Sequence, residues 1–165
     1  MNAVKRIAIV PGSFDPITVG HLDIVQRAAE AYDIVYLAIM INPEKQYMFT
    51  MVQRKQLAEA AVRSMDNVKV ITSEGMLWKL AADLNACAIV KGYRNEKDLA
   101  YEETMANYNR EHNPQAETIL LKANEKLVDI SSTAVRAKIL SGENLRPYLP
   151  QSVIDEIYKI LPRSL

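Results

Sequence analysis

Five short runs of apolar residues, separated by longer stretches with helical spacing, constrain the fold of this chain more than any other feature of its sequence. Each run is nearly continuous instead of alternating between apolar and polar residues. This pattern is typical of strands in a parallel sheet that is covered on both faces. The predicted strands cover residues 6–10, 34–41, 68–71, 86–90 and 118–121.

The stretches between these runs repeat apolar side chains at intervals of three and four residues, as amphipathic helices do. Thr50 and Gln53 have the spacing of a capping box, and Gly142 is expected to end a helix over residues 132–141. The predicted stripes are Leu22, Val25, Ala29, Tyr32; Leu57, Ala61, Met65; Leu77, Leu80, Ala81, Leu84; Tyr101, Met105, Tyr108, His112; and, after Pro150, Val153, Ile154, Ile157, Leu161.

Strands and helices that alternate along the chain predict the α/β class, here a doubly wound, Rossmann-like five-stranded parallel sheet with helices on both faces. The length of 165 residues predicts a single domain over residues 1–165. In such sheets ligands bind beyond the carboxyl ends of the strands, so the junctions between a strand and the next helix are where a functional site is expected.

The charges and the few cysteines limit the class of partner and the compartment. Lys and Arg total 20, and Asp and Glu also total 20, which argues against nucleic acid or an anionic membrane as partner. No apolar run approaches the roughly 20 residues of a membrane span, and the run after Arg6 is too short for a signal peptide. The single Cys87, expected to pack as a small hydrophobe, favours a reduced cytoplasmic protein, and the scarcity of Cys and His argues against a zinc site.

The junction after the first predicted strand has the features of a phosphate site. Gly12 and Ser13 offer a tight turn, and a helix is expected to start near Thr18, where free N–H groups and the positive end of the dipole favour an anion. His21 would project from that first turn toward the same ligand. The alternative is that Thr18 only caps the helix and His21 lies at the surface.

Two later junctions carry similar features. The fourth strand ends in Lys91-Gly92-Tyr93-Arg94, and two cations at the end of a buried strand favour a phosphate site over a solvated face. The segment from Val128 to Arg136 places consecutive hydroxyls at a helix start, which fits either phosphate binding or a well-capped helix. Lys45 lies in the loop after the second strand, where a lysine is usually solvated and without a function.

The string from Gly12 to Pro16 followed by Thr18-Val19-Gly20-His21 resembles the signature of the nucleotidyltransferase superfamily, and the longer string is similar to that of the bacterial phosphopantetheine adenylyltransferase family. The Ile130-Ser131-Ser132-Thr133 segment with Arg136 resembles the family's second signature. The similarity extends from Arg6 to about Leu161. One departure is Lys91, where the family usually has an arginine, which changes the geometry available to a phosphate.

The resemblance implies roles for individual residues. His21, Lys45 and Arg94 would be catalytic, with His21 donating a hydrogen bond to the α-phosphoryl oxygens. The acceptor substrate would contact Ser13, Lys45, Leu77, Lys91, Tyr101, Met105 and Asn109, although Met105 also fits a plain core position. ATP would contact Ser13, Phe14, His21, Gly92, Tyr93, Arg94, Glu102, Leu127, Val128, Asp129, Ile130, Ser131, Ser132, Thr133 and Arg136.

The activity implied by the resemblance is adenylyl transfer from ATP to 4′-phosphopantetheine, giving 3′-dephospho-coenzyme A and pyrophosphate. Mg²⁺ is expected to accompany ATP with no metal ligand set supplied by the protein. A cytoplasmic homohexamer is also implied. Two alternatives stay open: another small-molecule nucleotidyltransferase, such as one acting on nicotinate mononucleotide, and a nucleotide-binding module without turnover.

Overall fold

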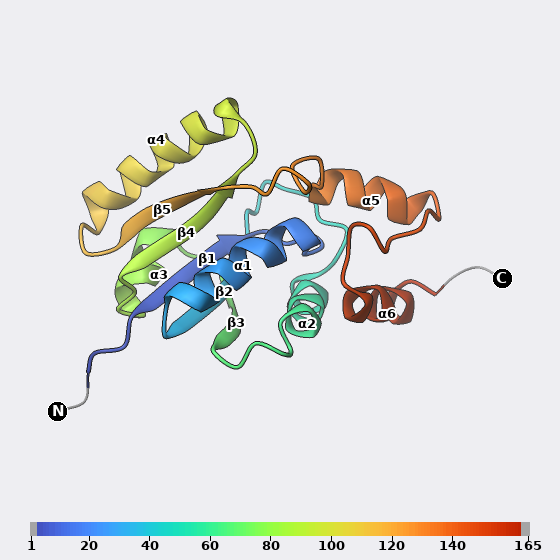
Figure 1. Ribbon diagram of the computed structural model, residues 1–165, viewed down its shortest axis with the longest axis horizontal. Coiled ribbons are helices and arrows are strands. Elements are labelled where there is room, and N and C mark those ends of the chain that lie inside the picture. The colour runs from blue at the N-terminus through green and yellow to red at the C-terminus, as the bar shows by residue number, and fades with distance from the viewer. Residues whose placement is uncertain (1–2, 163–165) are drawn as a thin grey trace.

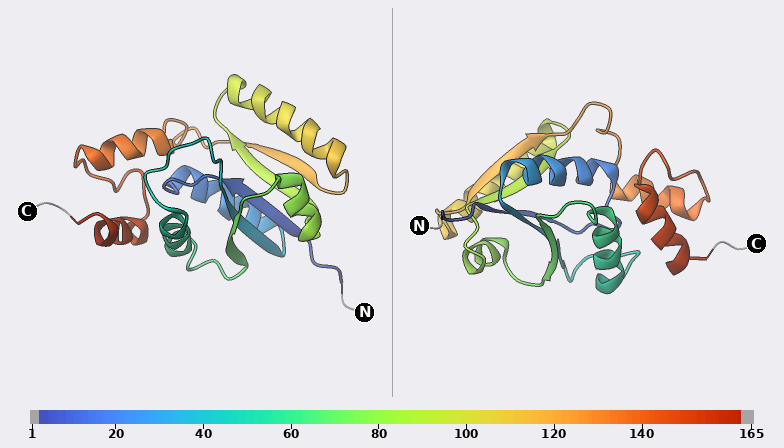
Figure 2. Two further views of the ribbon diagram at one scale, coloured as in Figure 1. Left: turned by 180° about the vertical axis from the view of Figure 1, so that it is seen from behind. Right: turned by 60° about the horizontal axis from the view of Figure 1, so that its bottom comes forward.

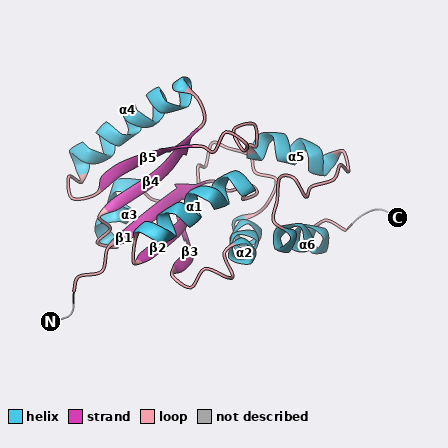
Figure 3. Cartoon of the chain, in the orientation of Figure 1, coloured by secondary structure: helices cyan, strands magenta, loops and turns pink. Residues whose placement is uncertain are grey.

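The computed structural model describes residues 3–162, and at its centre lies a five-stranded sheet whose strands all run parallel (Figure 1). Figure 3 shows this sheet in magenta with the helices packed around it. The strands lie side by side in the order β3-β2-β1-β4-β5, which confirms the doubly wound fold. Their bounds are β1 (Ile7–Gly12), β2 (Ile34–Met40), β3 (Val68–Ser73), β4 (Ala88–Tyr93) and β5 (Glu117–Lys122).

Helices cover both faces of the sheet. Their bounds are α1 (Val19–Ala31), α2 (Met51–Ala61), α3 (Leu77–Asp83), α4 (Glu96–His112), α5 (Ser132–Leu140) and α6 (Gln151–Ile160). On one face, Val25 of α1 packs in a core with Ala8 and Val10 of β1, whereas on the other Ala81 of α3 packs with Ile9. Both faces of β1 are therefore buried, which explains why the apolar runs are continuous.

Helices α5 and α6 lie together at one end of the molecule, beyond the carboxyl ends of the strands (Figure 1 and Figure 2). Helix α6 packs against α2, and Val153, Ile154 and Ile157 of its predicted stripe are buried. Leu161, the last residue of that stripe, follows the end of α6 and is exposed. None of the helices in residues 3–162 has the length and apolar character needed to cross a membrane.

Strands β1 and β4, at the point where the strand order reverses, pair only over a short distance. β1 pairs with β2 along its whole length, but it pairs with β4 only at Ala8 with Ala88 and at Ile9 with Ile89. Beyond these positions the two strands supply separate walls of a cavity, with Val10 to Gly12 on one side and Val90 to Tyr93 on the other. The reversal of strand order thus leaves space for a ligand.

Several strands extend further than predicted from the apolar runs. β1 continues through Gly12 and β4 through Tyr93, because the neighbouring strands still offer partners in register, Ile39 for Gly12 and Lys122 for Tyr93. As a result Lys91 and Gly92 lie inside β4 and not after it. The backbone that carries the predicted phosphate site is therefore held by the sheet itself.

Helix α4 forms as predicted, but the stripe of Tyr101, Met105, Tyr108 and His112 is not the face that it buries. Tyr101 is 63% exposed and Tyr108 is 38% exposed, whereas Ala106 and Asn109 are buried. Helix α4 contacts β4, β5 and α3. The rings of Tyr108 and His112 instead lie 4.3 Å apart near the surface.

Candidate active site

A cavity of about 530 Å³ lies at the carboxyl ends of β1 and β4. It contains most of the residues predicted from the sequence to bind substrates, although they come from five different junctions. The predicted residues that line it are Ser13, Phe14, His21, Lys45, Leu77, Lys91, Gly92, Tyr93, Arg94, Tyr101, Glu102, Leu127, Ile130, Ser131, Ser132 and Thr133.

His21 is held in place by the start of α1. Thr18 is the N-cap, and its Oγ1 accepts a hydrogen bond from the His21 N–H, while the Thr18 N–H donates to His21 Nδ1 at 3.1 Å. The pair forms a capping box with a histidine in the position that usually carries Glu or Gln. Thr18 caps the helix as the alternative requires, but His21 is half-buried and lines the cavity instead of lying at the surface.

The capping box determines which ring nitrogen of a neutral His21 carries the proton. Because Nδ1 accepts from the Thr18 N–H, the proton lies on Nε2, which is then a hydrogen-bond donor. Burial, with a smaller contribution from the positive charge of Arg94, lowers the pKa of His21 from 6.5 to about 4. The imidazole is therefore neutral near pH 7 and still able to donate a hydrogen bond.

The ring of Phe14 supports His21 from the side. The two ring centroids are 5.0 Å apart and the rings are nearly perpendicular. Phe14 has a positive φ of 48° and its ring covers Gly12, where an added Cβ would meet the ring at 2.9 Å. Glycine at position 12 is thus required by the close approach of the ring that packs against His21.

Two cations of the cavity are each paired with a carboxylate from α4. Lys91 forms an ion pair with Glu102, and Arg94 Nε lies 3.3 Å from Asp98 Oδ2, which also accepts the backbone N–H of Arg94. Asp98 was not predicted, although its position four residues after Arg94 and its place in the first turn of α4 are visible in the sequence. These carboxylates therefore fix the positions of the two cations at the wall of the cavity.

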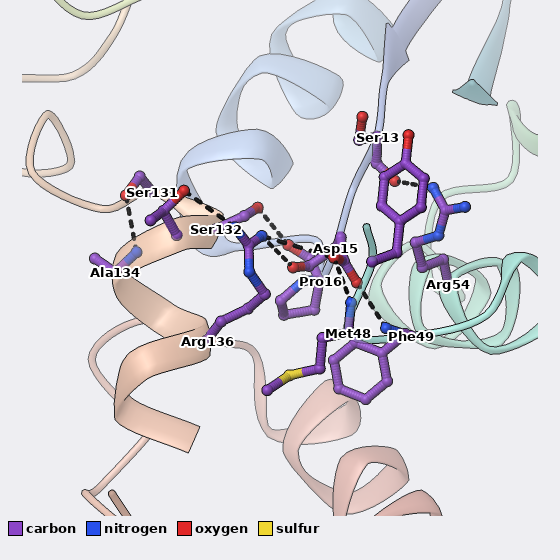
Figure 4. A network of polar contacts seen from close by, with 12 residues as sticks. Ser13, Asp15, Pro16, Met48, Phe49, Arg54, Ser131, Ser132, Ala134 and Arg136 are labelled. Carbon is purple, nitrogen blue, oxygen red and sulfur yellow. Dashed lines mark hydrogen bonds and ion pairs between the residues drawn. The ribbon is translucent and has the colours of Figure 1, made fainter. Parts of the chain in front are cut away.

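The start of α5 forms another wall of the cavity. Ser131 is the N-cap, with its Oγ accepting the Ala134 N–H at 3.1 Å, and Ser132 Oγ donates to the Pro16 carbonyl at 2.8 Å (Figure 4). Two helix starts, those of α1 and α5, therefore face the same cavity. Helix starts of this kind are favourable positions for phosphate oxygens.

The structure places some of the predicted residues away from the lining. Met105 is half-buried and Asn109 is buried in α4, and neither lines the cavity that Tyr101 lines. Val128 and Asp129 precede α5 and do not line the cavity either. Arg136 is turned toward Asp15, with Nη1 donating to the Asp15 carbonyl at 2.9 Å.

A buried polar network behind the cavity was not predicted from the sequence (Figure 4). Asp15 is 3% exposed and Arg54 is 2% exposed, and Arg54 Nη1 donates to the Ser13 carbonyl at 2.8 Å. Asp15 belongs to the motif string, but no sequence pattern shows that its carboxylate is buried. Arg54 has the appearance of an ordinary charged helix residue in the sequence.

No cluster of three or more His, Cys, Asp or Glu side chains that could hold a metal ion occurs within residues 3–162. The carboxylates of the cavity, Asp98 and Glu102, are occupied by Arg94 and Lys91.

Comparisons with known proteins agree with this geometry. A model of the cytidylyltransferase-like family matches residues 9–138. The phosphopantetheine adenylyltransferase of Streptococcus pneumoniae (strain CGSP14) is 39% identical over 153 residues, which are 92% of this chain and 94% of that protein. The protein of the same name from Caldanaerobacter subterraneus subsp. tengcongensis is 36% identical over 159 residues, 96% of this chain and 99% of that protein.

Solved structures support the fold. A structure of a Vibrio parahaemolyticus protein described as a nicotinate-nucleotide adenylyltransferase covers 93% of this chain and 99% of its own, with a TM-score of 0.67 and 19% identity. At that identity the likeness concerns the fold alone. The sequence relatives, which extend over nearly the whole chain at more than a third identity, decide the family. The chain belongs to the phosphopantetheine adenylyltransferase family, within the cytidylyltransferase-like proteins.

Proposed function

We propose that this chain transfers the adenylyl group of ATP to 4′-phosphopantetheine, forming 3′-dephospho-coenzyme A and pyrophosphate. The observation that carries the proposal is the meeting of the His21 imidazole with the cations Lys45, Lys91 and Arg94 in one cavity that two helix starts also face. Such a cavity suits two phosphorylated substrates. We infer the acceptor, 4′-phosphopantetheine, from the names of the relatives.

The transfer needs alignment and charge stabilisation more than acid–base catalysis. A phosphate oxygen of the acceptor attacks the α-phosphorus of ATP, the new P–O bond forms, and the bond to the β-phosphate oxygen breaks to release pyrophosphate. The attacking oxygen is already ionised near neutral pH. The residues of the cavity therefore act by holding two polyanions in line and by donating hydrogen bonds where negative charge increases.

Each residue has a defined task in this proposal. His21 donates from Nε2 to the α-phosphoryl oxygens, and it is neutral before ATP binds, because burial and Arg94 lower its pKa to about 4. Lys45 and Lys91 hold the acceptor phosphate, and Lys91 keeps its contact with Glu102 while it does so. Arg94 and the start of α5 at Ser131 hold the leaving pyrophosphate.

Mg²⁺ belongs to the proposal as a companion of ATP that neutralises part of the charge on its phosphates. In this proposal the ligands of Mg²⁺ are phosphate oxygens and water, because Asp98 is paired with Arg94 and Glu102 is paired with Lys91. A homohexamer in the cytoplasm is proposed from the family resemblance. Light scattering of the purified chain tests the assembly, and a monomeric mass would contradict it.

The activity is tested by offering ATP and Mg²⁺ with either 4′-phosphopantetheine or nicotinate mononucleotide and following pyrophosphate release. We expect release that depends on 4′-phosphopantetheine. Release only with nicotinate mononucleotide would favour another nucleotidyltransferase of the same fold. Binding of ATP with no release for either acceptor would favour the nucleotide-binding module.

A further inference from the structure

Asp15 carries a buried charge that the proposed reaction does not use. Its side chain is 3% exposed, and its two oxygens accept hydrogen bonds from consecutive backbone N–H groups, Oδ1 from Phe49 and Oδ2 from Met48, both at 2.9 Å. A buried carboxylate is tolerated only where it is hydrogen-bonded and paired. Asp15 therefore ties the junction after β1 to the end of the loop that follows β2 (Figure 4).

The counter-charge for Asp15 comes from a third segment. Arg136 Nη1 lies 3.7 Å from Asp15 Oδ2 and donates to the Asp15 carbonyl at 2.9 Å, while Nη2 donates to Thr133 Oγ1 at 3.1 Å. The Arg136 side chain is 31% exposed, whereas that of Asp15 is 3% exposed. With these contacts the guanidinium faces Asp15 and not the cavity.

The loop held by Asp15 is the one that carries Lys45. Met48 lies three residues after Lys45, and the other end of the loop is fixed by the Asn42 N–H, which donates to the Tyr47 hydroxyl at 2.9 Å. The guanidinium of Arg54 lies 3.9 Å from the centre of the Tyr47 ring. The position of Lys45 relative to His21 is thus set by contacts that include Asp15.

We infer that Asp15 and Arg136 form a positioning pair that places the Lys45 loop against the junction carrying His21. Arg136 then acts on the reaction through Asp15, and not by holding the phosphates of ATP as its place in the signature motif implies. The kinetic part of this inference rests on the proposed function. The structural part concerns the loop alone and does not depend on turnover.

The kinetic test compares Arg136→Gln with Lys138→Gln, a matched control that removes a cation from the same helix, where Lys138 contacts Glu143 and Tyr148 instead. Loss of the pair should lower kcat/KM for 4′-phosphopantetheine about tenfold, the size expected for a lost charge-assisted hydrogen bond. The dissociation constant of ATP, measured by calorimetry, should stay within about twofold. Lys138→Gln should change neither quantity.

A double-mutant cycle with Lys45→Ala shows whether Arg136 acts through the loop. If it does, Arg136→Gln should change kcat/KM less than about twofold once Lys45 is absent, since coupled residues are not additive. Any of three results would overturn the inference. In Arg136→Gln these are ATP binding weakened about tenfold or more, or an unchanged kcat/KM. In the double variant it is a loss of kcat/KM equal to the product of the two single losses. Arg136→Lys, which keeps the charge, should recover part of the loss.

Hydrogen exchange supplies a readout without catalysis. The amides of Met48 and Phe49 should exchange at least about tenfold faster in Arg136→Gln and in Asp15→Asn than in Lys138→Gln, because their acceptor is weakened. Equal exchange rates in all variants would overturn the positioning of the loop. If the wild-type chain releases no pyrophosphate with 4′-phosphopantetheine, the proposed function fails, and the exchange rates alone then decide the inference.

Discussion

His21 uses its two ring nitrogens for different purposes. Nδ1 accepts the Thr18 N–H and completes the cap of α1, which leaves Nε2 as the donor on a neutral ring. The same residue therefore stabilises a helix and takes part in the proposed chemistry. The two contributions are separable by substitution, because an asparagine side chain offers an acceptor near the position of Nδ1 and nothing near Nε2.

We predict that His21→Asn lowers kcat by about 10²–10³-fold, as loss of a donor to developing charge does. The dissociation constant of ATP should change far less. His21→Ala should lose kcat to a similar extent and also destabilise the chain by about 1 kcal/mol, because the Thr18 N–H loses its acceptor. Turnover and denaturant unfolding of both variants measure this, and a His21→Asn variant with near-normal kcat would contradict the role of Nε2.

Lys91 is the second residue whose chemistry can be tested directly. It faces the cavity from β4 and is paired with Glu102, whose side chain is 15% exposed. An arginine here would reach the same carboxylate and still present a planar fork to a phosphate.

We predict that Lys91→Arg lowers KM for 4′-phosphopantetheine by about fivefold, the equivalent of one additional hydrogen bond of about 1 kcal/mol. Steady-state kinetics measure the change, and Lys97→Arg, an exposed position in the first turn of α4, is the matched control. An unchanged KM would mean that the Lys91 ammonium does not contact the acceptor phosphate.

At the scale of elements, the ends of the helices determine where the junctions lie. Helix α5 starts at a serine cap in the wall of the cavity and ends at Gly142, which has a φ of 73°. The Glu143 N–H bonds to the Lys138 carbonyl at 3.1 Å and the Gly142 N–H to the Ile139 carbonyl at 3.2 Å, the pattern of a Schellman motif. Both ends of α5 are thus fixed by local hydrogen bonds.

We predict that Gly142→Ala lowers the free energy of unfolding by about 1 kcal/mol, because a side chain is disfavoured at positive φ. Turnover should be unchanged, since this end of α5 does not line the cavity. Gly75→Ala is the matched control, because an added Cβ meets nothing within 4 Å there and no positive φ is involved. Equal free energies of unfolding for the two variants in urea would contradict a requirement for glycine in the Schellman motif that ends α5.

At the scale of the whole molecule, the cavity exists because β1 and β4 part beyond Ile9 and Ile89 and because segments from distant parts of the chain close around the gap. Burial of the His21 side chain in the folded chain is the main reason why its pKa falls to about 4, and the positive charge of Arg94 is the smaller cause. The imidazole of His21 therefore stays neutral in the folded chain at pH values just below 6.5, where the same imidazole is protonated in the unfolded chain.

This linkage predicts a loss of stability in acid. Above about pH 6.5 the unfolded chain leaves the imidazole neutral as well, so the contribution of His21 is fully present. As the pH falls from 6.5 toward 4, the unfolded state binds the proton first, and about 3 kcal/mol of stability is lost. Urea unfolding between about pH 7 and about pH 4 should therefore show a steeper decline for the wild type than for His21→Asn. Parallel curves would contradict the lowered pKa.

The sequence alone determined the α/β class and most elements, because continuous apolar runs mark buried strands and Thr50, Ser131 and Gly142 mark helix ends by local chemistry. The motif strings also determined the family and most of the cavity lining, since these residues lie at or after the carboxyl ends of strands that meet at one edge. Such signals are local and can be read from a few consecutive residues.

Only the tertiary structure decided what depends on residues distant in the chain. The buried face of α4 carries Ala106 and Asn109, whereas the aromatic spacing predicted the face with Tyr101 and Tyr108. The pairing of Asp15 with Arg136 joins positions 121 residues apart, and it turns a cation of the signature motif away from the cavity. The pKa of His21 depends on burial by several segments at once. These properties follow from packing and from the environment of a charge, which no single stretch of sequence contains.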